Sequence, residues 1–71
     1  MTQKEKILTG FGNQIKKLRE EKGISIRELA SRSGLEYSQV QRIEKGKVNL
    51  ALTTLMALSE GLEIHPSKIF P

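Results

Sequence analysis

The stretch ELASRSGLEYSQVQRIEKG, from Glu28 to Gly46, constrains the fold more than any other part of this chain. Two short apolar patterns flank Ser33-Gly34, and each is too short to form a stable helix without tertiary support. A sharp turn between two helices needs a residue in the left-handed conformation, which Gly34 supplies. A steep crossing needs a small residue at the contact, which Ala30 supplies. The spacing therefore predicts a helix-turn-helix, with helices over 26–33 and 37–45.

The second helix of this pair has two chemically different faces. Val40 and Ile43 predict its buried face, and Leu35 packs just ahead of it. At about 100° per residue, the opposite face carries Ser38, Arg42 and Lys45, flanked by Gln39 and Gln41. These are side-chain types that hydrogen-bond to base edges in the major groove of DNA. A merely solvated face would be served better by Glu and Lys, and this face holds no acid, although Glu36 and Glu44 lie at its borders.

The remainder of the chain also has helical patterns, and no strand pattern competes with them. Phe11, Ile15 and Leu18 predict a helix over 9–22 that ends at Gly23. Residues 1–8 are polar and read as a flexible N-terminal arm or a first-turn extension of that helix.

Three further local signals complete the expected architecture. Ser25 followed by Glu28 predicts a capping box at the start of the helix over 26–33. The apolar run after Ala51, which includes Leu52, Leu55 and Met56, predicts a helix over 52–60 that stops at Gly61 and forms the centre of the core. Pro66 suits a first helical turn, so a short fifth helix is expected over 66–70. The expected fold is an all-α, compact five-helix domain.

Composition narrows the functional class. A chain of 71 residues forms one domain, and it contains no cysteine for disulfides or thiolate metal sites. The single His65 cannot hold a metal alone, so no cofactor is expected. No apolar run approaches the roughly 20 residues of a membrane span, and the N-terminal segment has no signal-peptide core. We expect a soluble, cytoplasmic protein.

Charge and aromatic content bear on the partner. Twelve lysines and arginines against eight acids give a net charge of +4, which is compatible with a polyanion but is also common in small soluble domains. One tyrosine and two phenylalanines are too few for a single-strand binder that stacks bases on several rings. Duplex DNA is therefore the favoured nucleic acid.

The chain resembles the phage-repressor and Cro-like (XRE-type) helix-turn-helix domains of bacteria and their viruses over about residues 10–70. The resemblance rests jointly on IKKLREEKGISIRELA, SGLEYSQVQRIEKGK and TLMALSEGLEI. It implies a repressor-like domain over 9–71 that binds an inverted-repeat operator as a homodimer through the recognition helix 37–45. Such a regulator would be a repressor or an autoregulatory controller acting at the nucleoid.

Site residues follow from this resemblance and from the helix pattern. The expected base-reading residues are Tyr37, Ser38, Gln41 and Arg42. Arg42 is the candidate for a bidentate contact to guanine. Tyr37 could contact a thymine methyl, hydrogen-bond through its hydroxyl, or simply pack at the helix start. The expected phosphate contacts are Arg27, Gln39, Lys45, Lys47 and Asn49.

Two structural roles are also expected. The resemblance implies that Arg19 and Glu44 form an ion pair that ties the first helix to the end of the recognition helix, and the alternative is two separate surface charges. The apolar C-terminal end should both fold back on the core and meet a second copy, with Leu62 and Ile69 inward. The expected dimer surface is Leu62, Ile64, Ile69 and Phe70.

The sequence departs from the family pattern at three positions. Ile26 stands where Gln is common, so it packs as core or lies near the DNA, and Arg27 could replace the lost phosphate contact. Glu36 and Ala51 stand where a capping hydroxyl is common, and Asn49 is a partial substitute before the helix over 52–60.

Two other functional classes are compatible with so small a domain. A protein-interaction module on the same fold, such as an antitoxin or an adaptor, would favour apolar or acidic residues on the recognition helix. An enzyme would need a nucleophile–base pair, a phosphate loop or a metal cluster, and none is present, so the chain is expected not to be an enzyme. A stand-alone regulator, such as a restriction-modification controller, and the N-terminal domain of a longer protein both remain open.

Overall fold

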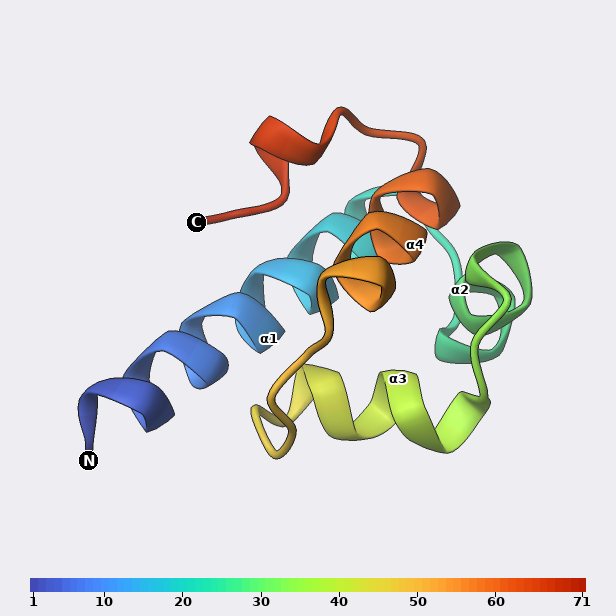
Figure 1. Ribbon diagram of the computed structural model, residues 1–71. Helices are drawn as coiled ribbons and strands as arrows, with labels where there is room; N and C mark the ends of the chain where they lie inside the picture. Colours follow the sequence, from blue (N-terminus) through green and yellow to red (C-terminus); the bar gives the residue numbers. More distant parts are fainter.

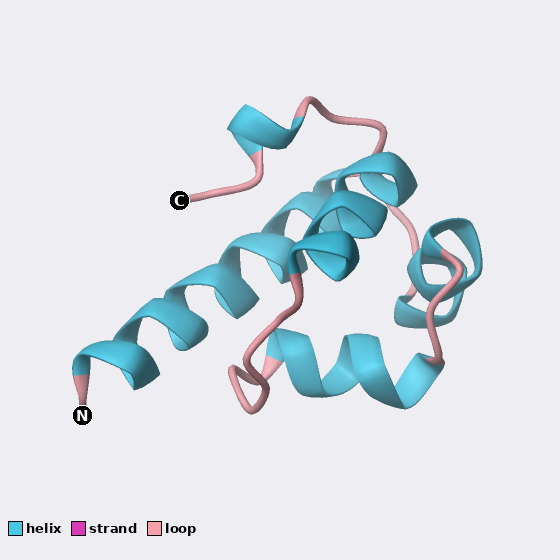
Figure 2. Cartoon of the chain, in the orientation of Figure 1, coloured by secondary structure: helices cyan, strands magenta, loops and turns pink.

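A computed structural model describes all 71 residues as four α-helices and one short 3₁₀ helix. They are α1 (Gln3–Glu21), α2 (Ile26–Ser33), α3 (Tyr37–Glu44), α4 (Leu52–Leu62) and η1 (Pro66–Lys68). Figure 2 shows that helices and loops make up the whole chain, which confirms the all-α class. Helix α3 packs against α1 and α2, and α4 packs against α2. In Figure 1, α3 lies on one side of the domain and η1 on the opposite side.

The fifth helix is shorter than the expected 66–70. Only a single 3₁₀ turn forms, with Pro66 at its start and the His65 ring nitrogen Nδ1 accepting from the Ser67 backbone N–H at 3.1 Å. Ile69 follows this turn as a fully buried residue. This short turn places the side chain of Ile69 in the core.

Helix α1 begins at Gln3, six residues before the expected start. Thr2 and Glu5 form a capping box, in which the Thr2 Oγ1 accepts from the Glu5 N–H at 3.1 Å and the Glu5 carboxylate accepts from the Thr2 N–H at 2.9 Å. The backbone hydrogen bond from Thr2, followed by the bond from its side chain, lowers the pKa of Glu5 below its ordinary value. The first two turns of α1 consequently extend beyond the body of the domain (Figure 1).

Only one of the two hydrogen bonds of the predicted capping box at α2 forms. The Ser25 Oγ accepts from the Glu28 N–H at 3.0 Å, as expected. The Glu28 carboxylate does not return to the Ser25 backbone, because it accepts from the Arg32 Nε at 2.9 Å one turn further along the helix. The hydroxyl alone therefore caps α2.

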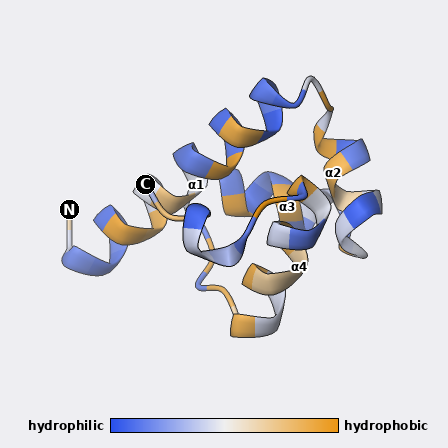
Figure 3. Ribbon diagram, turned by 90° about the horizontal axis from the view of Figure 1, so that it is seen from above, coloured by the Kyte–Doolittle hydropathy of each residue, from blue (hydrophilic) through white to orange (hydrophobic).

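The core consists of nine buried apolar residues drawn from all four α-helices and the C-terminal turn. Phe11, Ile15, Val40 and Ile43 are among them as predicted, whereas Leu18 and Leu35 are only partly buried and pack against the core. The alternation of hydrophilic and hydrophobic residues along α1 is visible in Figure 3. The nine are Phe11, Ile15, Leu29, Ala30, Val40, Ile43, Leu58, Leu62 and Ile69.

Gly61 does not end α4, contrary to the prediction. The helix continues to Leu62, and Glu63 ends it in the left-handed conformation with φ of 57°. Gly61 is needed for another reason: a Cβ there would collide with the Ser33 Oγ of α2. The glycine therefore permits the close contact of α2 and α4.

A glycine also permits the contact between α1 and α3. Gly12 is buried in α1, and a Cβ at this position would collide with the backbone carbonyl oxygens of Ile43 and Glu44. The backbone of α1 thus lies directly against the last turn of α3. Nothing in the local sequence of Gly12 announces this contact.

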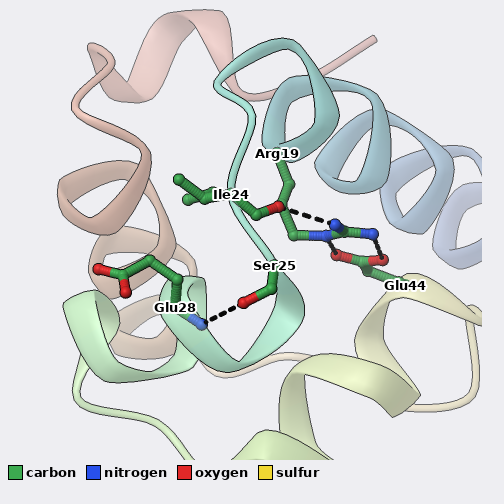
Figure 4. A network of polar contacts seen from close by, with 5 residues as sticks. All are labelled: Arg19, Ile24, Ser25, Glu28 and Glu44. Carbon is green, nitrogen blue, oxygen red and sulfur yellow. Dashed lines mark hydrogen bonds and ion pairs between the residues drawn. The ribbon is translucent and has the colours of Figure 1, made fainter.

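An ion pair at Arg19, about two turns after Gly12 along α1, joins the same two helices (Figure 4). The Arg19 Nε donates to the Glu44 Oε2 at 2.7 Å, and its second terminal nitrogen donates to the Oε1 at 3.1 Å. The remaining terminal nitrogen donates to the Ile24 carbonyl oxygen at 3.0 Å, in the loop before α2. Only 11% of the Arg19 side chain and 6% of the Glu44 side chain are exposed. One guanidinium therefore connects α1, the loop before α2, and α3.

The hydrogen bond to Glu44 raises the pKa of Arg19 above its ordinary value. A raised pKa in the folded state stabilises the fold at every pH below the unfolded pKa, and the contribution is lost only as the pH rises through the folded value. Arg19 therefore keeps its charge through neutral and moderately alkaline pH.

We predict that Gly12→Ala destabilises the domain by about 1–3 kcal/mol, because the added methyl group must displace the α3 backbone. Gly10→Ala is the matched control, since a Cβ there meets nothing within 4 Å. It should stabilise the protein by about 0.5–1 kcal/mol through helix propensity. Urea unfolding followed by circular dichroism measures both. A Gly12→Ala protein as stable as the Gly10→Ala protein would contradict the close contact.

We also predict that Arg19→Met costs about 3 kcal/mol in the free energy of unfolding, because the Glu44 carboxylate is left buried without its partner. Adding Glu44→Leu to this variant should recover part of the loss, since two apolar side chains replace the pair. Arg32→Met is the control: Arg32 and Glu28 are both substantially exposed, so it should cost less than about 1 kcal/mol. Equal losses for Arg19→Met and Arg32→Met would refute the structural role of the Arg19 pair.

Candidate nucleic-acid interface

The outer face of α3 is a polar helical surface that the fold leaves exposed. Val40 and Ile43 point into the core, and the opposite side of α3 faces away from α1 and α4 (Figure 1). The four base-reading candidates differ in their exposure to solvent. Tyr37, Ser38 and Arg42 are exposed, whereas Gln41 is partly buried.

Gln41 lies at the border of this face. It lines a cleft between α1, α2 and α3, together with Lys16, Ile26 and Lys45. Gln39, a phosphate candidate, is also partly buried. The structure therefore brings Tyr37, Ser38 and Arg42 together on the open face and places the two glutamines at its edges.

The loop after α3 carries three exposed phosphate candidates, Lys45, Lys47 and Asn49. Gly46 reverses the chain with φ of 71° and packs against the backbone of Thr9 in α1. This contact fixes the loop relative to the N-terminal half of α1.

The early start of α1 adds a lysine to this region. A cleft beside the loop is lined by Lys45 and Lys47 on one side and by the start of α1, with Lys4 and Glu5, on the other. The sequence pattern does not single out Lys4, because it favours a flexible arm or a first-turn extension over residues 1–8. The Thr2–Glu5 spacing was the signal that would have placed it on a helix.

Arg27, the remaining phosphate candidate, lies beside the start of α3. Its guanidinium carbon is 5.2 Å from the centre of the Tyr37 ring, within the range of a cation–π contact. Ile26, its neighbour, is partly buried and packs against the core. Of the two roles left open for Ile26, the structure therefore supports packing.

Neither Glu36 nor Ala51 supplies a side-chain hydrogen bond to the helix that follows it. Helices α3 and α4 thus begin without a side-chain cap at this position. Their orientation depends on packing and, for α3, on the contacts of Glu44 with Arg19.

The predicted dimer residues do not form one exposed surface. Leu62 and Ile69 are 1% and 0% exposed and belong to the core, and Ile64 is partly buried against it. Phe70 is 56% exposed, and its ring lies 5.8 Å from that of Phe11. Leu62 and Ile69 are buried within one copy because so small a domain needs both to complete its core.

Other apolar side chains are exposed instead, and sequence analysis assigned them to the core or to the N-terminal segment. Leu52 and Met56 lie one turn apart on α4 and are 74% and 43% exposed. Ile7 is exposed on α1 and lines an apolar groove with Phe11, Leu50, Leu55 and Phe70. The sequence pattern predicts α4 as the centre of the core, but only Leu58, Ser59, Gly61 and Leu62 of this helix are buried.

The structure contains neither a metal-binding cluster nor a membrane-spanning helix. No group of three or more histidine, aspartate or glutamate side chains is close enough to hold a metal ion. No helix has both the length and the apolar character needed to cross a membrane.

Comparison with known proteins agrees with this geometry. A helix-turn-helix family model matches residues 15–69. The control protein C.MunI from Mycoplasma sp. is 41% identical over 61 residues, which cover 84% of this chain and 82% of that protein. The HTH-type transcriptional repressor RghR from Bacillus subtilis (strain 168) is 36% identical over 58 residues, covering 80% of this chain and 43% of the repressor.

A solved structure gives the same result in three dimensions. The restriction-modification controller protein C.AhdI from Aeromonas hydrophila superposes with a TM-score of 0.87 at 38% identity. The match covers 89% of this chain and 96% of the controller. These relatives are named as regulators and controllers, which confirms that the chain is not an enzyme. The chain belongs to the XRE-type helix-turn-helix family.

Proposed function

We propose that this protein is a sequence-specific transcriptional regulator that binds an inverted-repeat DNA operator as a homodimer through α3. The observation that carries the proposal is the exposed face of α3, where Tyr37, Ser38 and Arg42 stand clear of the body and no acid interrupts them. Cationic side chains flank both ends, with Arg27 near the start of α3 and Lys45 and Lys47 after its end. The names of the relatives, a control protein and a transcriptional repressor, support a repressor or a controller. We further propose that the protein is autoregulatory and acts in the cytoplasm at the nucleoid.

Binding divides into affinity and discrimination. Lys and Arg side chains at both ends of α3 neutralise phosphates and release counterions, so affinity falls steeply with salt. Polar groups beside them fix the register of the protein on the duplex. The phosphate contacts proposed are Arg27, Gln39, Lys45, Lys47 and Asn49. Helix α3 then lies in the major groove, where Arg42 donates to a guanine and Ser38 and Gln41 contact neighbouring bases.

A second copy is needed because one such module buries too little surface for tight specific binding. We propose that the apolar groove, together with exposed Leu52 and Met56 of α4, forms the dimer surface. Of the residues predicted from the sequence, Phe70 lines this groove, whereas Ile64 does not. Leu62 and Ile69 support this surface from inside the core. Leu52 and Met56 are exposed one turn apart on α4, so that a second copy seated there would remove both from water. Two copies would contact half-sites about one helical turn apart.

Selection from a random duplex DNA library, followed by sequencing, tests the proposal. We predict enrichment of an inverted repeat with half-sites about one turn apart. Arg42→Ala should lose preference at one base pair in each half-site, a loss worth about 1–3 kcal/mol of discrimination. Lys68→Ala is the matched control, because it also removes one charge but lies on η1, on the side of the domain opposite α3 (Figure 1). It should leave every preference intact.

The same selection tests the dimer surface. Met56→Glu places a charge on the exposed part of α4 and should convert the enriched sequence from an inverted repeat to a single half-site. If the Met56→Glu variant still enriched the inverted repeat, the dimer surface would not include this part of α4. Absence of DNA binding at low salt for the unmodified protein would exclude the regulator and direct the search to a protein partner.

A further inference from the structure

The start of α3 contains a contact that the proposed base readers do not use. The Arg27 guanidinium, on α2, lies over the ring of Tyr37, the first residue of α3. We propose that Tyr37 acts as a positioning residue, which holds Arg27 against a DNA backbone phosphate, rather than as a reader of a base. This inference rests on the proposed function, because the phosphate belongs to the duplex that α3 contacts.

The fold brings these two side chains together through the turn. Gly34, with φ of 67°, reverses the chain between the helices, and Leu35 donates its N–H to the Ala30 carbonyl oxygen at 2.9 Å. The first turns of α2 and α3 thereby lie close enough for a contact of 5.2 Å between the guanidinium carbon and the ring centre. Both side chains are exposed, so the stack lies at the surface beside the open face of α3.

Two of the other three arginines have carboxylate partners, whereas Arg42, like Arg27, forms no ion pair. Arg19 is neutralised by Glu44, and Arg32 is paired with Glu28 and Glu63. Arg27 has no carboxylate partner, although Glu28 is its neighbour in sequence, because Glu28 is engaged by Arg32. The ring is therefore the only side chain that restrains the Arg27 head group.

A ring and a carboxylate restrain an arginine with different consequences for an anionic partner. A carboxylate must be displaced before a phosphate binds, and it cancels the charge that attracts the phosphate. An aromatic face leaves the charge in place and leaves the edge N–H groups of the guanidinium free to donate. It also limits the conformations of a long side chain, which lowers the entropic cost of ordering that side chain on binding.

Phosphate is the favoured acceptor because Arg27 stands on α2, outside the base-reading face of α3. The helix before the recognition helix crosses the backbone in this motif. The role proposed for Tyr37 then needs its ring and not its hydroxyl. If Tyr37 contacted a base through its hydroxyl, the hydroxyl would be the essential group.

A double-mutant cycle tests the proposal. The full chain, Arg27→Ala, Tyr37→Ala and the double variant are titrated by fluorescence anisotropy with two duplexes, the selected operator and a random sequence, at several salt concentrations. We expect a coupling of about two- to fivefold in Kd between the two positions on both duplexes, because a phosphate contact does not depend on sequence. Arg27→Ala should reduce the slope of log K against log salt by about 0.9, and Tyr37→Ala should reduce it by a similar or smaller amount.

Tyr37→Phe separates the two roles. It keeps the ring, so we expect unchanged affinity, salt slope and base preference. Arg27 and Ser38 serve as the control pair, for which additive effects are expected. Thermal melting of each variant shows that the fold is retained.

Three outcomes would overturn the inference. Additive effects of Arg27→Ala and Tyr37→Ala would show that the ring does not position the arginine. Loss of one base preference in Tyr37→Phe would show that the hydroxyl contacts a base. Coupling on the operator but not on the random duplex would replace the phosphate by a base. Failure of the proposed function is distinct, since the unmodified chain would then bind neither duplex.

Discussion

The bond between Arg19 and Glu44 is the constraint on which the rest of the structure depends. Helix α3 has eight residues and lacks a side-chain cap, so its orientation comes from tertiary contacts. One guanidinium binds the last residue of α3 in a bidentate geometry and also binds the Ile24 carbonyl before α2. Gly12 removes the side chain that would otherwise hold α1 and α3 apart. The Arg19–Glu44 pair and the close contact at Gly12 hold the buried side of α3, and they thereby set the orientation of its exposed face.

The same contacts distribute the charged groups around α3. The turn at Gly34 brings Arg27 beside the start of the helix, and the turn at Gly46 places Lys45 and Lys47 beside α1. Helix α3 is thus bordered by cations at both ends, while its own open face carries polar groups. A scaffold of this kind separates the residues that supply affinity for a duplex from those that supply discrimination. That separation is the physical basis of the regulator proposed for this chain.

The sequence predicted features whose causes are local and could not predict those that arise from tertiary contact. Gly34, Val40 and Ile43 have roles that spacing alone reveals. Gly12 and Gly61 are required by residues that lie far away in sequence, so no local pattern marks them. The sequence pattern favours both the core and the dimer surface for Leu62 and Ile69. In the structure both are buried in the core, because so small a domain needs them to complete it. The early start of α1 was predictable from Thr2 and Glu5 but was hidden by the polar character of the segment.

The central claim is that the buried contacts of α3 present its opposite face to DNA. A crystal structure of the chain bound to the duplex that it selects tests this claim most directly. The account predicts α3 in the major groove, the Arg42 guanidinium within hydrogen-bond distance of a base edge, and the Arg19–Glu44 pair intact in each of two symmetry-related copies. A complex in which DNA lies against another surface, with the outer face of α3 in solvent, would contradict it.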